Sequence, residues 1–174
     1  SWSMAVNLST LQFEQPSLVN TVLNCLALHH VPPEMLILEV TETTAMSNPD
    51  ESVRVLTELT KAGVKASIDD FGTGYSSLLY LKRLPACELK IDRAFVKELS
   101  GESEDATIVS AIVALAKTLN LKVVAEGVET EAQQAFLTEL GCNTLQGYLL
   151  GKPVSAQTIE ALCARGEMLP GAGL

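Results

Sequence analysis

The sequence predicts an α/β fold of the TIM-barrel type, a (β/α)8 barrel that is incomplete at its N-terminus. Short apolar runs alternate along the chain with segments of helical periodicity, which is the order that produces parallel strands joined by helices. Polar residues able to bind a metal or transfer a proton stand at or near the ends of these runs. About six strands can be counted, fewer than the eight of a complete barrel.

Five apolar runs are predicted as strands, and a polar residue stands at or near the C-terminal end of each. A sixth, shorter strand is predicted at residues 143–146. Parallel strands of a barrel bring their C-terminal ends to one face, where barrel enzymes keep their catalytic groups. We therefore expect these polar side chains to converge on one rim. In chain order the runs and their polar residues are Met4–Val6 with Asn7, Met35–Leu38 with Glu39, Val64–Ile68 with Asp69 and Asp70, Cys87–Leu89 with Lys90, and Val123–Ala125 with Glu126.

Helical periodicity fills the segments between these strands. Pro49 occupies the first position of one helix, which Gly63 ends, and Thr130 caps another, which Gly141 ends. A longer helix is expected to pack on the sheet through an apolar face that begins at Ile108. The predicted helices are residues 16–30, 49–61, 105–119, 131–140 and 155–164.

Length and charge limit the classes of protein to consider. The 174 residues suffice for one domain, which we expect over residues 1–166, followed by a flexible tail of small residues and proline at 167–174. Twelve basic against 21 acidic residues give a net charge of −9, which argues against binding a nucleic acid polymer. No apolar stretch approaches the roughly 18 residues of a membrane span. We expect a cytoplasmic domain without membrane contact, although a longer protein could be anchored elsewhere.

Cysteine and histidine residues do not indicate a zinc site. The four cysteines lack Cys-x-x-Cys spacing and are expected to be buried thiols in a reducing compartment. His29 and His30 are expected to end a helix, where a cation suits the helix dipole.

Asp69 and Asp70 form the most informative pair of residues. Two carboxylates a few Å apart repel by about 4 kcal/mol at an effective dielectric constant near 20, so a fold keeps both ionised only beside a cation. Carboxylate oxygens suit hard ions such as Mg²⁺ or Mn²⁺, and two such ions are a common device for cutting phosphate esters. The alternative from the residues alone is that Asp69 caps the following turn while Asp70 is solvated.

Around this pair the chain resembles the EAL-domain family of bacterial cyclic di-GMP phosphodiesterases. The matching segments occur in the family order and span nearly the whole chain. They are Asn7-Leu8-Ser9 with Gln12-Phe13, Leu38-Glu39-Val40-Thr41-Glu42, Asp69 to Ser77, Leu89-Lys90-Ile91-Asp92, Ala125-Glu126-Gly127-Val128-Glu129 and Gln146-Gly147-Tyr148.

The resemblance implies two bound ions, Mg²⁺ or Mn²⁺. Asn7, Glu39 and Asp69 would hold one, and Asp69 would bridge to a second held by Asp70 and Glu126. Lys90 would orient or deprotonate the attacking water, with Glu126 as its partner in catalysis. Considered singly, the Asn7 side chain could instead hydrogen-bond to the backbone of a loop, and Lys90 could form an ion pair with Asp92 or Glu88.

Further residues receive roles from the same resemblance. Glu42 would anchor the loop from Asp69 to Gly74, and Glu129 would support the metal ligands. Gln146, Asp92 and Gln12 would contact the substrate. The residues alone also allow Glu129 to be an acidic residue that favours a helix start.

One feature of the family is missing. The Glu-Ala-Leu motif of the first barrel strand cannot be assigned, because Glu160-Ala161-Leu162 lies in the last predicted helix. Since the chain begins with Ser1, without an initiator methionine, we interpret this end as a cut.

The resemblance implies hydrolysis of cyclic di-GMP to linear pGpG, by a homodimer with a sensor or cyclase domain upstream. We expect little turnover from these 174 residues alone. The alternative is an inactive EAL-like module that binds cyclic di-GMP and passes the signal to a partner.

Overall fold

The structure is a computed structural model that describes residues 2–74, 77–99 and 103–165. Within these ranges the strands are hydrogen-bonded in the order of the sequence, from β1 to β6, and the pairs β1–β2, β2–β3 and β5–β6 are parallel. This is the strand order of part of a (β/α)8 barrel, as predicted. The strands are β1 (Met4–Leu8), β2 (Leu36–Thr41), β3 (Lys65–Phe71), β4 (Glu88–Ile91), β5 (Lys122–Ala125) and β6 (Thr144–Leu145).

The structure contains the long helices that the sequence predicts and adds short helices that it does not predict. Helices α2, α4, α7, α8 and α9 were predicted, whereas α1, α3, α5 and α6 were not. The expected tail and two residues of the glycine-rich loop, Tyr75 and Ser76, lie outside the described residues. The helices are α1 (Thr10–Phe13), α2 (Leu18–Leu28), α3 (Glu42–Ser47), α4 (Pro49–Lys61), α5 (Leu78–Leu81), α6 (Arg93–Lys97), α7 (Glu104–Thr118), α8 (Glu131–Leu140) and α9 (Ala156–Arg165), with a 3-10 turn η1 (Pro33–Met35) before β2.

The chain divides into two compact units. The first consists of residues 1–90 and 115–122, and the second of residues 91–114 and 123–174. No helix in the described ranges is both long enough and apolar enough to cross a membrane.

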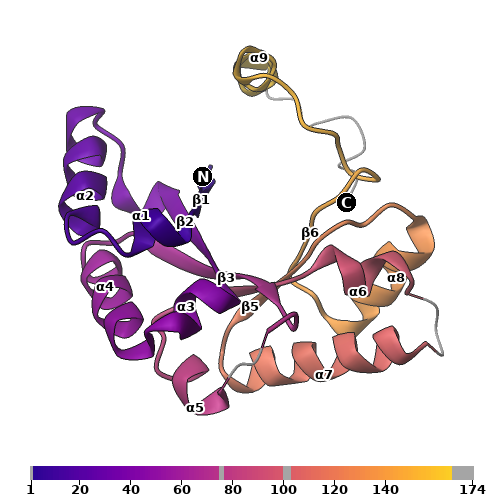
Figure 1. Cartoon of the computed structure of the whole chain (residues 1–174). Coiled ribbons are helices and arrows are strands. Elements are labelled where there is room, and N and C mark those ends of the chain that lie inside the picture. Colours follow the sequence, from indigo (N-terminus) through magenta and orange to yellow (C-terminus); the bar gives the residue numbers. More distant parts are fainter. Residues whose placement is uncertain (1, 75–76, 100–102, 166–174) are drawn as a thin grey trace. The chain divides into compact units, whose positions relative to one another are not determined.

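In the first unit, α3 and α4 pack against β3, and α2 packs against α4 (Figure 1). The core between these layers contains Val40 and Ile68 from the strands, with Leu56 and Leu59 from α4, all fully buried. β1 stands first in the strand order, and its residue Met4 is 65% exposed. An apolar strand with one free edge and an exposed face is prone to association.

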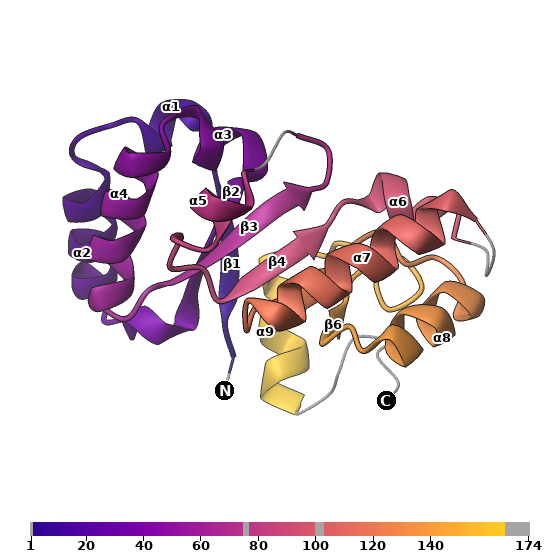
Figure 2. The ribbon, with the colours of Figure 1, turned by 90° about the horizontal axis from the view of Figure 1, so that it is seen from below.

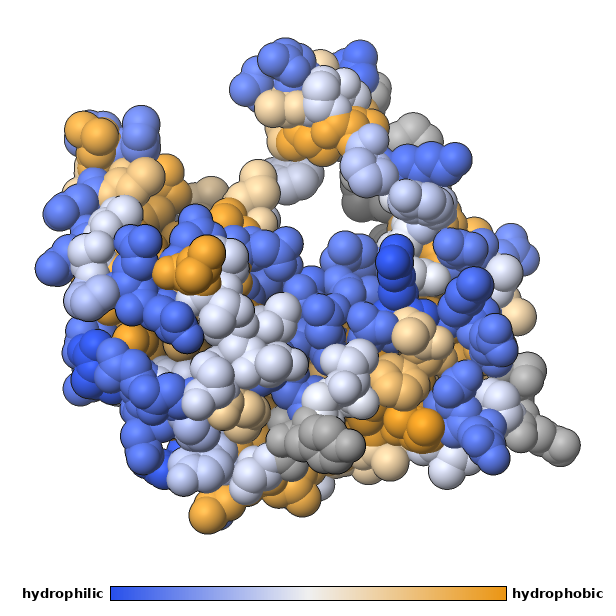
Figure 3. All heavy atoms as spheres, in the orientation of Figure 1, coloured by the Kyte–Doolittle hydropathy of each residue, from blue (hydrophilic) through white to orange (hydrophobic). Residues whose placement is uncertain are grey.

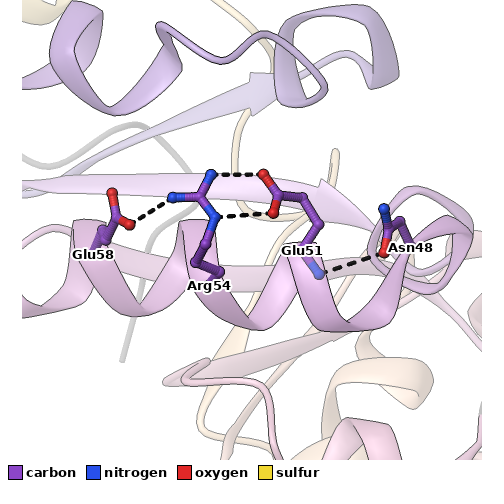
Figure 4. A network of polar contacts seen from close by, with 4 residues as sticks. All are labelled: Asn48, Glu51, Arg54 and Glu58. Carbon is purple, nitrogen blue, oxygen red and sulfur yellow. Dashed lines mark hydrogen bonds and ion pairs between the residues drawn. The ribbon is translucent and has the colours of Figure 1, made fainter.

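The outer face of α4 is hydrophilic. Asn48 caps the helix by accepting a hydrogen bond from the backbone N–H of Glu51 at 3.4 Å, and Arg54 bonds to Glu51 at 2.6 and 2.9 Å and to Glu58 at 2.6 Å (Figure 4). The hydrogen bond from Arg54 lowers the pKa of Glu51. These groups are exposed, so the network contributes little to stability. Figure 3 shows a mainly hydrophilic surface over α4.

The second unit contains α8 and most of α7 (Figure 2). The buried face of α7 includes Val109, Ile112 and Val113, whereas Ile108 is 40% exposed. The prediction that Ile108 belongs to the buried face is therefore wrong, because the buried positions run from Ala106 through Val109 to Ala116 on the neighbouring face. Gly141 ends α8 in the left-handed region with φ 86°, as its predicted role as a C-terminal cap requires.

The cysteines correct a second expectation. All four are free, but Cys25 and Cys163 are exposed, while Cys87 and Cys142 are half-buried. Cys25 and Cys163 each lie beside a buried leucine on an amphipathic helix, Leu26 and Leu162, and therefore face away from the core. Burial raises the pKa of the Cys87 thiol.

Candidate active site

Strands β1, β2 and β3 place three of the predicted metal ligands on neighbouring positions. Asn7 is the register partner of Glu39, and Glu39 is the partner of Ser67. Asp69 follows two residues after Ser67 and therefore lies on the same face of β3. These residues lie within strands, since β3 continues through Asp69 and Asp70 to Phe71. The sequence had placed both aspartates after the strand.

Lys90 joins two of these carboxylates from β4. Its Nζ atom lies 2.9 Å from Oε1 of Glu39 and 3.0 Å from Oδ1 of Asp69. All three residues are more than nine-tenths buried. Contacts this short between a lysine and two carboxyl groups are strong charge-assisted hydrogen bonds in a desolvated setting.

The amide of Asn7 completes this cluster. With its nitrogen facing the carboxylates, the amide donates to Oε2 of Glu39 at 3.2 Å and to Oδ2 of Asp69 at 3.3 Å. Rotated by half a turn, the same amide presents its oxygen beside the two carboxylate oxygens, an arrangement that repels unless a cation lies among them. Three oxygen donors of this kind fit Mg²⁺ or Mn²⁺, so the residues present suit the implied metal.

Glu42, at the start of α3, lies against the glycine-rich loop. Its Oε2 atom accepts from the backbone N–H of Gly72 at 2.8 Å and from that of Gly74 at 3.4 Å. A Cβ atom at Gly74 would lie 3.2 Å from Cδ of Glu42, so the loop approaches this carboxylate closely. The carboxylate is 2% exposed, and these amides supply the hydrogen bonds that a buried charge needs.

Asp70 has an unusual backbone for a residue with a side chain. Its φ is 52°, in the left-handed region, and its N–H donates to Oδ1 of Asp69 at 3.0 Å. Thr73 then donates its hydroxyl to the Asp70 carbonyl at 2.8 Å. This turn points the side chains of Asp69 and Asp70 in different directions. A left-handed φ costs conformational energy for a non-glycine residue and is found mainly at functional sites.

Sequence reasoning missed a chain of hydroxyl groups beside these ligands. Thr41 donates to Thr44 at 2.9 Å, and Thr44 lies 2.7 Å from the hydroxyl of Thr10. Thr44 is 3% exposed, and either of the hydroxyls of Thr44 and Thr10 can donate to the other. The chain therefore ties the first residue of α1, three positions after Asn7, to the helix that begins with Glu42. Nothing in the spacing of three threonines indicates this link.

The second unit holds three further predicted residues, Glu126, Glu129 and Gln146. Glu126 follows β5, and its N–H donates to the carbonyl of Ile91 at 3.2 Å. A cavity of about 230 Å³ opens beside it, lined in part by predicted residues. The lining residues are Arg93, Glu126, Gly127, Glu129, Gln146, Gly147 and Tyr148.

Gly147 is required by the close approach of two backbones in this cavity wall. A Cβ atom there would lie 2.1 Å from the carbonyl oxygen of Val128 and 2.2 Å from its nitrogen. Val128 donates to the carbonyl of Gln146 at 3.0 Å, which holds the two segments together. The glycine thus brings Gln146 beside the loop that contains Glu126 and Glu129.

A second cavity of the same unit measures about 430 Å³ and is lined by Arg93, Ala94, Lys97, Gly127 and Glu129. No role was predicted from the sequence for Arg93 or Lys97, which are basic residues on the short helix α6.

Two residues expected to contact substrate have local partners. Asp92 caps α6 by accepting from the N–H of Ala94 at 2.6 Å. Gln12 forms a capping box with Ser9, whose N–H donates to the Gln12 amide oxygen at 3.1 Å. Substrate contact by either residue stays a prediction.

The strands follow one another in parallel order, and acidic groups and a lysine lie near their C-terminal ends. These features define a barrel-type protein with a candidate metal centre. The EAL domain model matches residues 2–153, and the chain belongs to this family.

Named relatives and solved structures agree with this membership. The chain is 64% identical over 163 residues to the bifunctional diguanylate cyclase/cyclic di-GMP phosphodiesterase MucR of Pseudomonas aeruginosa, covering 94% of this chain and 24% of MucR. The solved structure of the PaMucR phosphodiesterase in complex with c-di-GMP superposes with a TM-score of 0.89 at 65% identity, covering 91% of this chain and 70% of that one. The chain thus spans about a quarter of the length of MucR.

A more distant structure bears on metals. Klebsiella pneumoniae BlrP1, solved as complexes of cyclic di-GMP with calcium and with manganese, matches with a TM-score of 0.77 at 34% identity. The match covers 87% of this chain and 39% of that one.

Proposed function

We propose that the domain to which this chain belongs, in the full product of its reading frame, hydrolyses one phosphodiester bond of cyclic di-GMP and releases linear pGpG. The observation that supports the proposal most directly is the buried cluster in which Lys90 lies within 3.0 Å of both Glu39 and Asp69, beside the amide of Asn7. A cluster of ionised groups this deeply buried is costly as a structural element and is typical of catalytic sites.

The proposed cofactors are two divalent ions, Mg²⁺ or Mn²⁺. Such ions supply an acidic bound water and neutralise charge on the phosphate. The proposed ligands are Asn7, Glu39, Asp69, Asp70 and Glu126. Support comes from the all-oxygen donor set of the first three and from the calcium and manganese complexes of BlrP1.

The chain's own groups take distinct parts in this reaction. Lys90, held by two carboxylates, orients the attacking water and stabilises negative charge as it develops. Glu42 holds the glycine-rich loop, and through it the aspartates that precede the loop. Glu129 supports the ligands from the loop after β5.

Contacts to the substrate are proposed for Gln146, Asp92 and Gln12. Gln146 has the strongest support, because it lines a cavity with Glu126 and Arg93. An arginine there suits a phosphate, which a chain of net charge −9 must otherwise attract through its metals and Lys90.

Assembly and location belong to the same proposal. We propose a homodimer in the cytoplasm, within a longer protein that has a sensor or cyclase domain upstream. Light scattering on the purified protein tests the dimer, and fractionation of cells tests the location.

The activity is tested with cyclic di-GMP and Mg²⁺ or Mn²⁺, with products resolved by chromatography, in this chain and in the full product of its reading frame. We expect pGpG from the longer protein, loss of product after exhaustive chelation, and binding with little turnover in Ca²⁺. Full rates after chelation would overturn the metal mechanism. Tight binding without product in every ion would favour a receptor that does not cleave.

A further inference from the structure

Gln133 in α8 uses every hydrogen-bonding position of its side-chain amide. Its Oε1 atom accepts from the N–H groups of Glu129 at 2.8 Å and Thr130 at 3.0 Å. Its Nε2 atom donates to the carbonyls of Val96 at 3.0 Å and Lys97 at 3.2 Å. A primary amide has two acceptor positions and two N–H donors, so the side chain is fully satisfied. It is 6% exposed, which makes loss of these bonds costly.

The two halves of this amide hold two different segments. The oxygen holds the end of the loop that follows β5, and the nitrogen holds the last turn of α6. Helix capping explains only the first half, because Thr130 and Gln133 form a capping box through the oxygen. The bonds to Val96 and Lys97 reach 37 and 36 residues back along the chain and contribute nothing to the cap.

Gly127 fixes the other end of the same two segments. Its φ is 71°, and a Cβ atom there would lie 2.6 Å from Cβ of Arg93. The loop therefore meets α6 at Arg93 on one side and is joined to Val96 and Lys97 through Gln133 on the other.

Between these two attachments lies the cavity of about 430 Å³, with Arg93 and Lys97 on one wall and Glu129 on the other. Arg93 and Glu129 also line the neighbouring cavity with Glu126 and Gln146. The distance between the walls depends on how the loop is held against α6.

We propose that Gln133 is a positioning residue for nucleotide binding: its amide holds the Gly127–Glu129 loop against α6 and so sets the pocket in which a cyclic dinucleotide is bound. The inference rests on the proposed function and adds to it a residue that does not itself touch the substrate. Small displacements of binding groups are known to cost large factors in binding and rate.

The decisive variant is Gln133→Glu. Glutamate is a usual capping-box residue at this position, so a role limited to the cap predicts no loss. In our proposal the variant loses both donors to Val96 and Lys97 and turns a carboxylate oxygen toward two carbonyls. The matched control is Gln134→Glu on the same helix, because no side-chain hydrogen bond of Gln134 occurs among the described residues. Gln133→Met removes all four bonds without adding charge and serves if Gln133→Glu fails to fold.

Affinity for cyclic di-GMP is measured in the full product of the reading frame, in Ca²⁺, together with thermal unfolding and hydrogen exchange of the amides at 126–130 and 93–97. We expect Gln133→Glu to weaken binding by at least about tenfold and to speed exchange in both segments by a similar factor, which is the scale of one of the two hydrogen bonds that it loses. The melting temperature should stay within a few degrees, and Gln134→Glu should match the wild type.

Wild-type affinity and exchange in Gln133→Glu would overturn the proposal, as would an equal loss in Gln134→Glu. A wild type that binds no cyclic di-GMP would overturn the proposed function. In that case the exchange rates still decide whether Gln133 holds the loop, because they need no ligand.

Discussion

Lys90 and Glu39 form a buried ion pair, with Nζ 2.9 Å from Oε1 and both side chains less than one-tenth exposed. The same ammonium group also meets Asp69, so one positive charge stands against two negative charges. The formal charges of these three groups sum to −1, which favours uptake of a cation.

Replacing Lys90 by alanine should lower turnover about a hundredfold or more, within the range for loss of a catalytic group. Binding of cyclic di-GMP should survive better, because the metal ligands remain. In chelator the variant should also lose about 3 kcal/mol of unfolding free energy, since Glu39 and Asp69 lose their buried partner, and metal should restore part of that loss. Steady-state kinetics and denaturant unfolding with and without Mg²⁺ measure both effects. Near wild-type turnover would reduce Lys90 to a structural ion pair.

Glu42→Ala should reduce activity and metal affinity together. The variant leaves the N–H groups of Gly72 and Gly74 without their acceptor, and the loop after Asp69 and Asp70 loses its attachment. Metal titration by calorimetry, beside activity, tests this expectation. The control is Glu34→Ala, an exposed glutamate of the same unit. Unchanged metal affinity and rate in Glu42→Ala would remove the anchoring role.

Thr44→Val should destabilise the fold by about 1 to 2 kcal/mol, because the hydroxyls of Thr41 and Thr10 lose a partner in a buried setting. Metal affinity should fall as well, since the link from α3 to the turn after Asn7 is lost. Thr44→Ser keeps the hydroxyl and should recover metal affinity. If the serine variant behaves like the valine variant, lost packing of the methyl group explains the effect instead.

The pH dependence of thiol reactivity follows from burial. The folded pKa of Cys87 lies above its ordinary value because burial disfavours the thiolate and Glu88 adds to the effect. At pH 7.5 a thiol reagent should modify the exposed Cys25 and Cys163 first and Cys87 more slowly, and Cys87→Ala identifies the slow class.

The raised pKa of Cys87 also determines how the stability of the fold changes with pH. In the unfolded chain the Cys87 thiol ionises near its ordinary pKa of about 8.5, before the folded thiol does. Its contribution to stability is therefore full below that pH and is lost as the pH rises through the folded pKa. Unfolding of wild type and Cys87→Ala between pH 7 and 10 should show a smaller alkaline loss in the variant. Equal alkaline losses in the two proteins would contradict this assignment.

Long elements could be predicted from sequence because each has its own local signal. Pro49 and Gly63 bracket α4, and the apolar run before Asp69 identifies β3. The four short helices have four to six residues, too few for an apolar face, and three depend on side-chain caps from Ser9, Thr41 and Asp92. The error at Ile108 also reflects a weak local signal, because the adjacent apolar residues Ile108 and Val109 fit either of two faces of the helix.

The candidate site was predictable as far as residue type and strand position determine it. Asn7, Glu39, Asp69 and Lys90 stood near the ends of predicted strands, and the structure brings these four together. Thr44 and Gln133 were missed because their roles depend on partners far along the chain. The spacing Thr130-x-x-Gln133 does indicate a capping box, but no local pattern reveals the bonds to α6.

The strand order has a consequence for how the protein is made. Each strand of the first three pairs with the next to leave the ribosome, as in the pairs Met4 with Leu36 and Ile37 with Lys65. Every new pairing therefore closes a loop of modest length, so assembly can proceed in the direction of synthesis. The first compact unit also includes residues 115–122, and it cannot be completed before that segment emerges. Until then the unit with the buried lysine and its carboxylates lacks the end of α7 and the segment after it, and we expect nascent chains that end before residue 115 to be held by chaperones.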